Sequence, residues 1–197
     1  MEGTLERAVH VLRRGGLVVY PTDTVYGLGA DALCDEAVER VFEAKQRPLS
    51  KPISIAVNDM EMLRCVSVVT PEAEEFATLF LPGPYTIVLK ARRILPKVLT
   101  GGTDLIGVRI PAHEIALALI EKFDGPITAT SANISGEKDP VSPEEVHVVH
   151  DLLIDGHVLP GTPSTVVDLV HFRVLRTGPG MEEIRDYLKR RGQRGVG

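Results

Sequence analysis

The sequence predicts one α/β domain built on a twisted, open, mixed sheet that is flanked by helices. Two observations carry this prediction. Short apolar, β-prone runs alternate with amphipathic stretches of helical period, and no linker or shift of composition divides the 197 residues. Polar, glycine-containing loops follow several strand ends, where open α/β sheets bind their ligands. We expect the domain to span residues 4–191, and we expect residues 192–197 to form a disordered tail.

Apolar residues at helical spacing, together with recognisable caps, predict the helices. The first helix is ended by Gly15-Gly16. Thr70 has the position of an N-cap before Pro71, and Ser142-Pro143-Glu144-Glu145 is a capping box that starts a later helix. The expected helices span residues 4–14, 35–46, 59–65, 71–80 and 113–123, a segment that starts at 143, and residues 181–191.

Short apolar runs bounded by glycine and proline predict the strands. Pro21 ends the first run, Pro82-Gly83-Pro84 forms a turn before another, and Gly101-Gly102 precedes the next. The expected strands span residues 17–20, 53–57, 85–91, 105–110, 127–130, 164–169 and 172–176.

Composition restricts the class of protein. A hydrophobic fraction of 44% and a charged fraction of 25% are those of an ordinary globular domain, and a formal charge of -5 disfavours a surface that binds nucleic acid everywhere. No apolar run is long enough for a membrane span, so we expect no membrane partner. Cys34 and Cys65 have neither metal-ligand nor redox spacing, so we expect a reduced, cytoplasmic protein.

Two polar segments indicate an anion site. Lys45-Gln46-Arg47 ends the second helix, and Ser131-Ala132-Asn133 follows an apolar run far downstream. Two cations, a hydroxyl and an amide suit a polyphosphate, and Ser131 and Asn133 point to the same side if the segment is extended. A cation in the last turn of a helix also complements the helix dipole, so spacing alone leaves both interpretations open.

Other site motifs are weak or absent. Residues 27–32 fit G-x-G-x-x-A, but the region about twenty residues on has basic residues where a ribose-binding acid belongs. The chain has neither a P-loop nor the G-x-S-x-G of serine hydrolases. His147 and His150 are spaced to share a metal but have no third ligand in a familiar spacing, so we expect no metal held by side chains.

Several motifs occur in the order of a known family. Residues 21–29, PTDTVYGLG, resemble the opening of the YrdC/TsaC family of threonylcarbamoyl-adenylate synthases. Residues 45–48 are similar to its K-x-R-P signature, and residues 130–136 to its S-x-N segment. Further matches lie at residues 82–86, 108–111, 164–166 and 175–180. The resemblance covers about residues 5–190 and implies the minimal, single-domain YrdC-like fold with a concave basic ligand surface.

The resemblance also implies a reaction. Family members join L-threonine, bicarbonate and ATP into threonylcarbamoyl-adenylate and release pyrophosphate, with Mg²⁺ expected on the nucleotide. A downstream transferase complex then modifies the adenosine beside the tRNA anticodon. By motif, the resemblance implies threonine binding by Thr24, Arg109 and Ser164, ATP binding by Lys45, Arg47, Lys51, Ser131, Asn133 and Arg176, and catalysis by Lys45 and Arg47.

Two departures and two alternatives accompany this interpretation. Many relatives have asparagine at the position of Lys51, which can still contact a phosphate as a point charge. Many also have histidine at the position of Ala56, whose side chain cannot hydrogen-bond, and this puts one threonine or bicarbonate contact in doubt. The alternatives are an RNA-binding module, which would add the basic residues of segment 92–97, and an inactive paralogue of the same fold. Segment 135–142 is our candidate for a mobile lid over the site.

Overall fold

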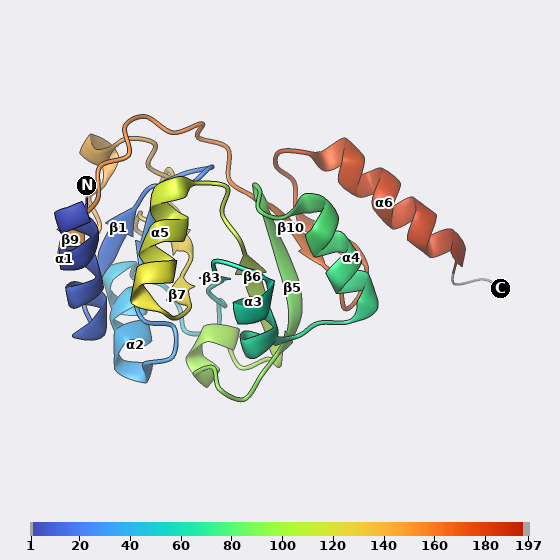
Figure 1. Cartoon of the computed structure of the whole chain (residues 1–197), viewed down its shortest axis with the longest axis horizontal. Coiled ribbons are helices and arrows are strands. Elements are labelled where there is room, and N and C mark those ends of the chain that lie inside the picture. Colours follow the sequence, from blue (N-terminus) through green and yellow to red (C-terminus); the bar gives the residue numbers. More distant parts are fainter. Residues whose placement is uncertain (1, 195–197) are drawn as a thin grey trace.

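The computed structural model describes residues 2–194 and arranges their strands in two mixed sheets (Figure 1). The four-stranded sheet has the order β8 (Thr130–Ser131), β2 (Gly27–Gly29), β1 (Val18–Tyr20), β9 (Leu152–Leu153). The seven-stranded sheet has the order β11 (Arg173–Arg176), β10 (Thr165–Asp168), β5 (Tyr85–Ala91), β6 (Leu105–Arg109), β3 (Ile55–Ala56), β7 (Ile127–Thr128), with β4 (Ser67–Val68) paired to β5.

Helices cover both ends of this arrangement. They are α1 (Glu2–Arg13), α2 (Asp35–Ala44), α3 (Met60–Val66), α4 (Pro71–Phe80), α5 (Glu114–Phe123) and α6 (Met181–Arg194), with 3-10 turns η1 (Lys97–Thr100) and η2 (Pro143–Glu145). Figure 1 shows α1 beside α5 at one end and α4 beside α6 at the other. No helix within residues 2–194 is long and apolar enough to cross a membrane.

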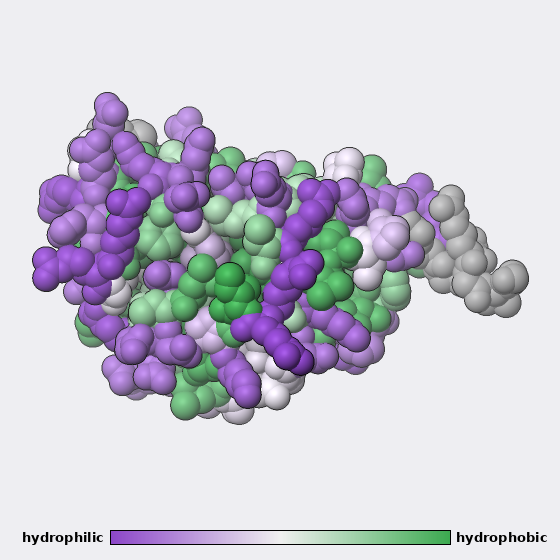
Figure 2. Space-filling model, turned by 60° about the horizontal axis from the view of Figure 1, so that its bottom comes forward, coloured by the Kyte–Doolittle hydropathy of each residue, from purple (hydrophilic) through white to green (hydrophobic). Residues whose placement is uncertain are grey.

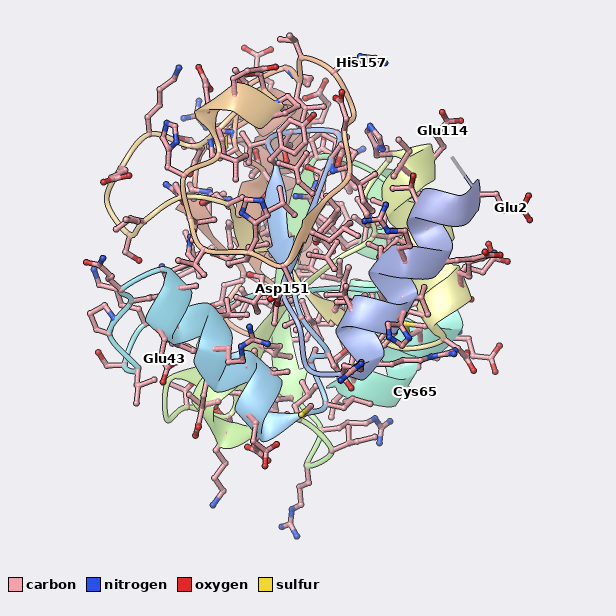
Figure 3. The ribbon with its side chains drawn as sticks, turned by 90° about the vertical axis from the view of Figure 1, so that its left-hand side faces the viewer. Glu2, Glu43, Cys65, Glu114, Asp151 and His157 are labelled. Atoms are coloured by element: carbon pink, nitrogen blue, oxygen red, sulfur yellow. The ribbon has the colours of Figure 1, made fainter. Side chains whose placement is uncertain are left out.

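Two groups of buried side chains hold the fold together. Leu5 and Leu12 of α1 pack with Leu119 of α5 against the four-stranded sheet, and burial of each such side chain contributes about 2 kcal/mol. A larger core joins α2 to both sheets and so fixes the end of α2. Asp151 lies between α1 and α2 (Figure 3), where its carboxylate accepts hydrogen bonds from Leu17 N and Arg40 Nη2.

The surface agrees with the composition. Hydrophilic side chains project from most of the face shown in Figure 2, with hydrophobic groups between them. Leu49 and Ile94, which are 59% and 55% exposed, are among the apolar side chains that remain in contact with solvent.

The sequence predicted one sheet, whereas the described strands form two. The expected strand over residues 127–130 is interrupted at Ala129, whose N donates to Ser54 O. Before this point β7 pairs with β3, and after it β8 pairs with β2. Thr128 joins the two sheets, because its Oγ1 accepts from Ala30 N and donates to Leu28 O. This crossing brings Ser131 to the same end of the molecule as β6.

The helix expected from residue 143 is wrong. Ser142 caps no backbone N–H, and only the 3-10 turn η2 forms. The Glu145 carboxylate instead accepts from Val141 N and Lys138 Nζ, so the reciprocal bonds of a capping box are not made. As a consequence, His147 and His150 do not lie on a helix.

The C-terminal helix is longer than expected. α6 runs from Met181 to Arg194 and so enters the segment predicted to be a disordered tail. The prediction for residues 195–197 lies outside the described residues. The domain boundary at residue 191 therefore stays a proposal.

Alanine at Gly180 is expected to destabilise the fold by more than backbone strain alone. Gly180 has φ +67, and a Cβ there would clash with the Tyr85 hydroxyl and lie 2.7 Å from Tyr85 Cζ. Gly102 is the matched control, because its φ is +85 but nothing lies within 4 Å of a Cβ. We expect Gly102→Ala to cost about 1 kcal/mol and Gly180→Ala at least twice that in urea unfolding. Equal costs would contradict the steric argument.

Candidate active site

A cavity of about 170 Å³ lies where strand ends from both sheets meet. Its charged lining side chains are Arg47, Arg109, Arg176 and Asp139. Hydroxyl groups surround them, from Tyr20, Thr22, Thr24, Thr86, Thr130, Ser54, Ser131 and Ser164. Three guanidinium groups against one carboxylate give the cavity a net positive charge, which favours anionic ligands.

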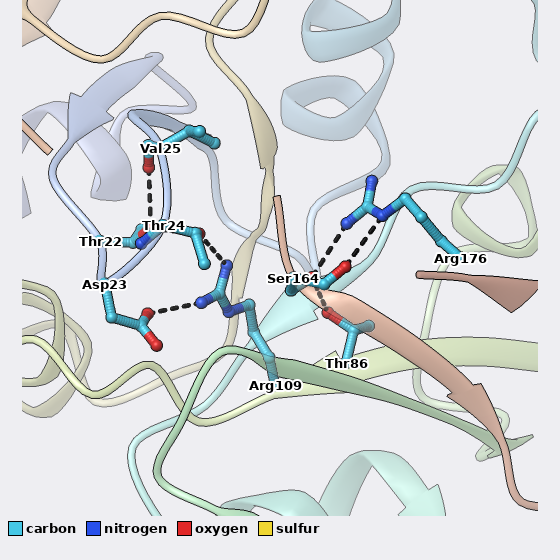
Figure 4. A network of polar contacts seen from close by, with 8 residues as sticks. All are labelled: Thr22, Asp23, Thr24, Val25, Thr86, Arg109, Ser164 and Arg176. Atoms are coloured by element: carbon cyan, nitrogen blue, oxygen red, sulfur yellow. Dashed lines mark hydrogen bonds and ion pairs between the residues drawn. The ribbon is translucent and has the colours of Figure 1, made fainter. Parts of the chain in front are cut away.

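Arg109 occupies one side of the cavity at the end of β6, and the residue is 7% exposed. Its Nη1 donates to Thr24 Oγ1 at 3.1 Å and its Nη2 to Asp23 Oδ1 at 2.5 Å (Figure 4). Thr24 Oγ1 is in turn 2.9 Å from Thr22 Oγ1. Within the described chain, Arg109 Nε is buried and has no hydrogen-bond partner. A buried donor without a partner is uncommon in native proteins, and it sets Arg109 apart from the other cations of the cavity.

A second polar group contains Arg176 and Ser164 (Figure 4). Arg176 Nε donates to Ser164 O and its Nη2 to Ser164 Oγ, both at 2.9 Å. Ser164 Oγ also lies 2.8 Å from Thr86 Oγ1 on β5. These contacts hold the guanidinium of β11 against the segment that leads into β10, so it has a fixed place on the cavity wall.

Arg47 reaches the cavity because the chain turns sharply after α2. Gln46 adopts the left-handed region at φ 50, and Arg47 N donates to Phe42 O. The guanidinium is then fixed by backbone carbonyls: Nε donates to Lys51 O at 3.1 Å and Nη2 to Pro52 O at 2.8 Å. Nη1 makes no hydrogen bond within residues 2–194, so both of its N–H groups are available to a ligand.

Lys45 does not line the cavity, contrary to the expectation that it contacts ATP. The residue is 1% exposed, and its Nζ donates to Ser131 O at 2.5 Å, Asn133 O at 2.7 Å and Asn133 Oδ1 at 3.0 Å. An ammonium group has three donors, and all three are used. Lys45 therefore holds the segment after β8 in place, and in this arrangement it has no donor left for a phosphate.

Asn133 is also used internally. Its Oδ1 accepts from Lys45 Nζ and Ser131 Oγ, and its Nδ2 donates to Glu137 O at 2.7 Å and Asp139 Oδ1 at 3.1 Å. The amide therefore links the end of α2 to two side chains that do line the cavity, Ser131 and Asp139. We call Lys45, Ser131, Asn133 and Asp139 the amide network.

The structure brings most of the sequence-predicted site residues together and leaves three out. Those that line the cavity are Thr24, Arg47, Arg109, Ser131, Ser164 and Arg176. Lys45 and Asn133 lie behind its wall, and Lys51 is exposed outside it. The predicted ATP contacts of these three side chains stay predictions, because Lys45 and Asn133 are hydrogen-bonded within the amide network and Lys51 is exposed outside the cavity lining.

Burial lowers the pKa of three cationic side chains in or beside the cavity. It lowers the pKa of Lys45 from its ordinary value to about 8, with Arg47 adding to the effect and Asp139 opposing it. Burial also lowers the pKa of the Arg47 and Arg176 guanidinium groups. Arginine remains protonated near neutral pH in proteins, so all three guanidinium groups of the cavity stay cationic.

Replacing Lys45 with methionine is expected to lower the free energy of unfolding by about 2–4 kcal/mol. The change keeps a long apolar stem but removes the lysine donor from the carbonyl oxygens of Ser131 and Asn133, and it leaves Asn133 Oδ1 with Ser131 Oγ alone. Lys122→Met is the control, because Lys122 is a surface residue whose ion pair with Glu6 spans 3.5 Å, and we expect less than about 0.5 kcal/mol there. Urea unfolding measures both, and equal losses would contradict the assigned role of Lys45.

Comparison with known proteins decides the family. The family model Sua5_yciO_yrdC, described as telomere recombination, matches residues 10–178. The chain belongs to this family. It is 45% identical over 198 residues to the threonylcarbamoyl-AMP synthase of Pyrococcus abyssi (strain GE5 / Orsay), an alignment that covers 95% of this chain and 58% of the relative. This member of the Sua5/YciO/YrdC family thus spans little more than half the length of that synthase.

Solved structures agree with this assignment. The fold resembles the crystal structure of P. abyssi Sua5 complexed with L-threonine, with a TM-score of 0.91 and 44% identity over 95% of this chain and 58% of the other. It also resembles E. coli YciO, with a TM-score of 0.82 and 31% identity over 91% of each chain. The predicted YrdC-like α/β fold is therefore confirmed.

Several residues of the site were not predicted from the sequence. Thr86 and Asp139 line the cavity, and Asp23 pairs with Arg109. Asp23 and Thr86 both lie within matched motifs, PTDT and residues 82–86, and these were the available signals, whereas Asp139 lies outside every matched motif. Ala56 is fully buried in the core and does not line the cavity.

The proposed lid at residues 135–142 is tied to its surroundings. Ser135 N donates to Lys45 O, Pro140 O accepts from Tyr26 N, and Val141 O accepts from Leu159 N. Movement of this segment stays a prediction, and it would require these bonds to open.

Proposed function

We propose that the chain synthesises L-threonylcarbamoyladenylate from L-threonine, bicarbonate and ATP, with release of pyrophosphate. One observation carries the proposal: Arg47, Arg109 and Arg176, from three distant segments, line one hydroxyl-rich cavity. A carboxylate and a polyphosphate together need several cationic donors at separate points, which a single anion does not. The synthase name of the P. abyssi relative and the threonine bound to P. abyssi Sua5 support the choice of substrates.

Arg109 is the proposed site of the threonine carboxylate. Thr24 and Asp23 use one N–H of each terminal nitrogen, and the second N–H of each is the proposed donor to the carboxylate. The hydroxyls of Thr24 and Ser164 line the same cavity and suit the polar groups of an amino acid. Held in this way, the amino group is kept at a fixed place for reaction with bicarbonate, which gives N-carboxy-threonine.

Arg47 and Arg176 are the proposed contacts to ATP. A carbamate oxygen of N-carboxy-threonine attacks the α-phosphorus, a new P–O bond forms, and the bond to pyrophosphate breaks. Negative charge then shifts onto the phosphoryl oxygens and the leaving group. Guanidinium groups fixed before the reaction stabilise that charge, because positioning and electrostatics dominate phosphoryl-transfer chemistry. Ser131 Oγ adds a neutral contact, and Lys45 acts through the amide network.

A magnesium ion is expected to accompany the nucleotide. Within residues 2–194, no group of three or more His, Cys, Asp or Glu side chains could hold a metal ion. Asp139 supplies one carboxylate on the cavity, and one carboxylate plus phosphate oxygens fits the usual coordination of Mg²⁺. When bound, the ion supplies positive charge to the phosphates.

Release of pyrophosphate tests the proposal in its simplest form. We expect release to require all three substrates, and omission of L-threonine or bicarbonate to reduce it to the background. Release that is independent of L-threonine would contradict the proposed reaction and would favour a paralogue with another substrate. Boiled protein and the Arg47→Ala variant are the controls.

The wider cellular role is part of the same proposal. We infer that the product passes to a transferase complex that modifies tRNA in the cytoplasm. RNA binding by the chain stays a prediction: Lys51, Arg92, Arg93 and Lys97 are exposed outside the cavity. A filter-binding titration against salt tests it, because phosphate contacts give a steep salt dependence.

A further inference from the structure

Asp139 is the one acidic side chain among the described residues that line the cavity. On the proposed function, the cavity also receives the triphosphate of ATP. A carboxylate beside phosphate groups repels them, and the repulsion is strong where water is excluded. A cavity that only had to bind phosphates would be better served by an amide at this position. The carboxylate therefore requires an explanation.

The amide network fixes the orientation of the Asp139 carboxylate. Asn133 Nδ2 donates to Asp139 Oδ1, and the amide is itself fixed because its Oδ1 accepts from both Lys45 Nζ and Ser131 Oγ. The buried part of this network connects Asp139 to the end of α2. One oxygen of the carboxylate is thus used to set its orientation.

The other oxygen is free. Asp139 Oδ2 makes no hydrogen bond within residues 2–194, and none of the ion pairs formed there includes Asp139. The carboxylate is close enough to act on two cations electrostatically. Burial lowers the pKa of Lys45 and of Arg176, and the negative charge of Asp139 opposes this change in both. No direct bond joins Asp139 to either cation, so an internal ion pair does not account for the carboxylate.

We propose that Asp139 is the protein's contact to the divalent cation that accompanies ATP. This inference rests on the proposed function. Mg²⁺ prefers oxygen ligands and is commonly held by one or two carboxylates together with substrate phosphates. The cavity offers one oriented carboxylate with a free oxygen, and the nucleotide supplies the remaining charge. Among residues 2–194 no group of three or more His, Cys, Asp or Glu side chains could hold a metal ion, so on this proposal the phosphates of ATP supply the other anionic ligands.

Binding of ATP without L-threonine tests this inference apart from catalysis. Equilibrium dialysis gives the Kd of ATP with excess Mg²⁺ and with EDTA, and the ratio of the two values measures the coupling between metal and nucleotide. Asp139→Asn removes the charge but keeps an oxygen that can accept from Asn133. Glu137→Gln is the matched control, because it removes one charge from the same segment and its side chain does not line the cavity.

We expect Mg²⁺ to strengthen ATP binding in the unaltered protein and in Glu137→Gln by the same factor. In Asp139→Asn that factor should fall about tenfold, and binding in EDTA should become tighter because a repulsive charge is gone. The electron paramagnetic resonance signal of free Mn²⁺, titrated in the presence of ATP, should show the same loss of metal affinity.

Other outcomes overturn the inference. An unchanged ratio in Asp139→Asn would show that the carboxylate does not contact the cation. An equal fall in Glu137→Gln would assign the effect to net charge rather than to a contact. If the unaltered protein does not bind ATP at all, the proposed function fails, and this inference fails with it.

Discussion

Replacing Arg47 with alanine is expected to lower turnover by about 10²–10³-fold, the usual effect of removing one preorganised donor from a developing charge. The guanidinium is fixed by the carbonyl oxygens of Lys51 and Pro52, and its Nη1 remains available to the phosphates. The loss should appear in kcat more than in the KM of ATP, since the charge that it stabilises grows in the transition state.

Lys51→Ala is the matched control for Arg47→Ala. The two residues belong to the same basic segment, but Lys51 is exposed and its side chain does not line the cavity. We expect the control to retain turnover within about twofold. If Lys51→Ala loses as much as Arg47→Ala, the cavity is not where the phosphates bind. If Arg47→Ala keeps full turnover, the assigned role of Arg47 is wrong.

Replacing Arg109 with lysine is expected to raise the KM of L-threonine about 10–100-fold and to leave the KM of ATP nearly unchanged. Lysine keeps one positive charge, so Asp23 does not become an unpaired buried carboxylate. It lacks the planar fork that contacts Thr24, Asp23 and a ligand carboxylate at once. One lost hydrogen bond to a charged group is worth about 1.5–3 kcal/mol, which corresponds to this change.

Arg185→Lys is the control for Arg109→Lys, because Arg185 is exposed on α6 and does not line the cavity. Thermal unfolding of both variants checks that the fold is retained. An unchanged KM for L-threonine in Arg109→Lys would contradict the assignment of Arg109. A parallel rise in the KM of ATP would show that the two substrates are not bound at separate points.

Local signals predicted much of the fold. Thr70 and Pro71 cap α4, which spans the expected residues 71–80, and β5 spans the expected residues 85–91. The interruption of the strand at Ala129 had no local signal, because it depends on Ser54 and on pairing with β2. The division into two sheets therefore depends on tertiary contacts, and the periodicity of the sequence could not predict it.

The site was predictable to the extent that its residues follow strand ends. Arg109 and Ser164 do so and line the cavity as expected. The burial of Lys45 was not predicted, because a cation in the last turn of a helix is ordinarily solvated. Lys45 is buried because the segment after β8 packs against it. Nothing in the sequence indicated that Asp139 lines the cavity, because an acidic residue in a loop is usually exposed. Its orientation depends on the hydrogen bond from Asn133.

Synthesis with ¹³C-bicarbonate tests the proposed reaction most directly. Purified protein is incubated with ATP, L-threonine and labelled bicarbonate, and the products are analysed by mass spectrometry. We expect an adenylate whose mass contains one threonine and one ¹³C, and we expect it to form about 10²–10³-fold more slowly when Arg47 is replaced with alanine. A protein that binds ATP but forms no labelled adenylate would contradict the proposed function.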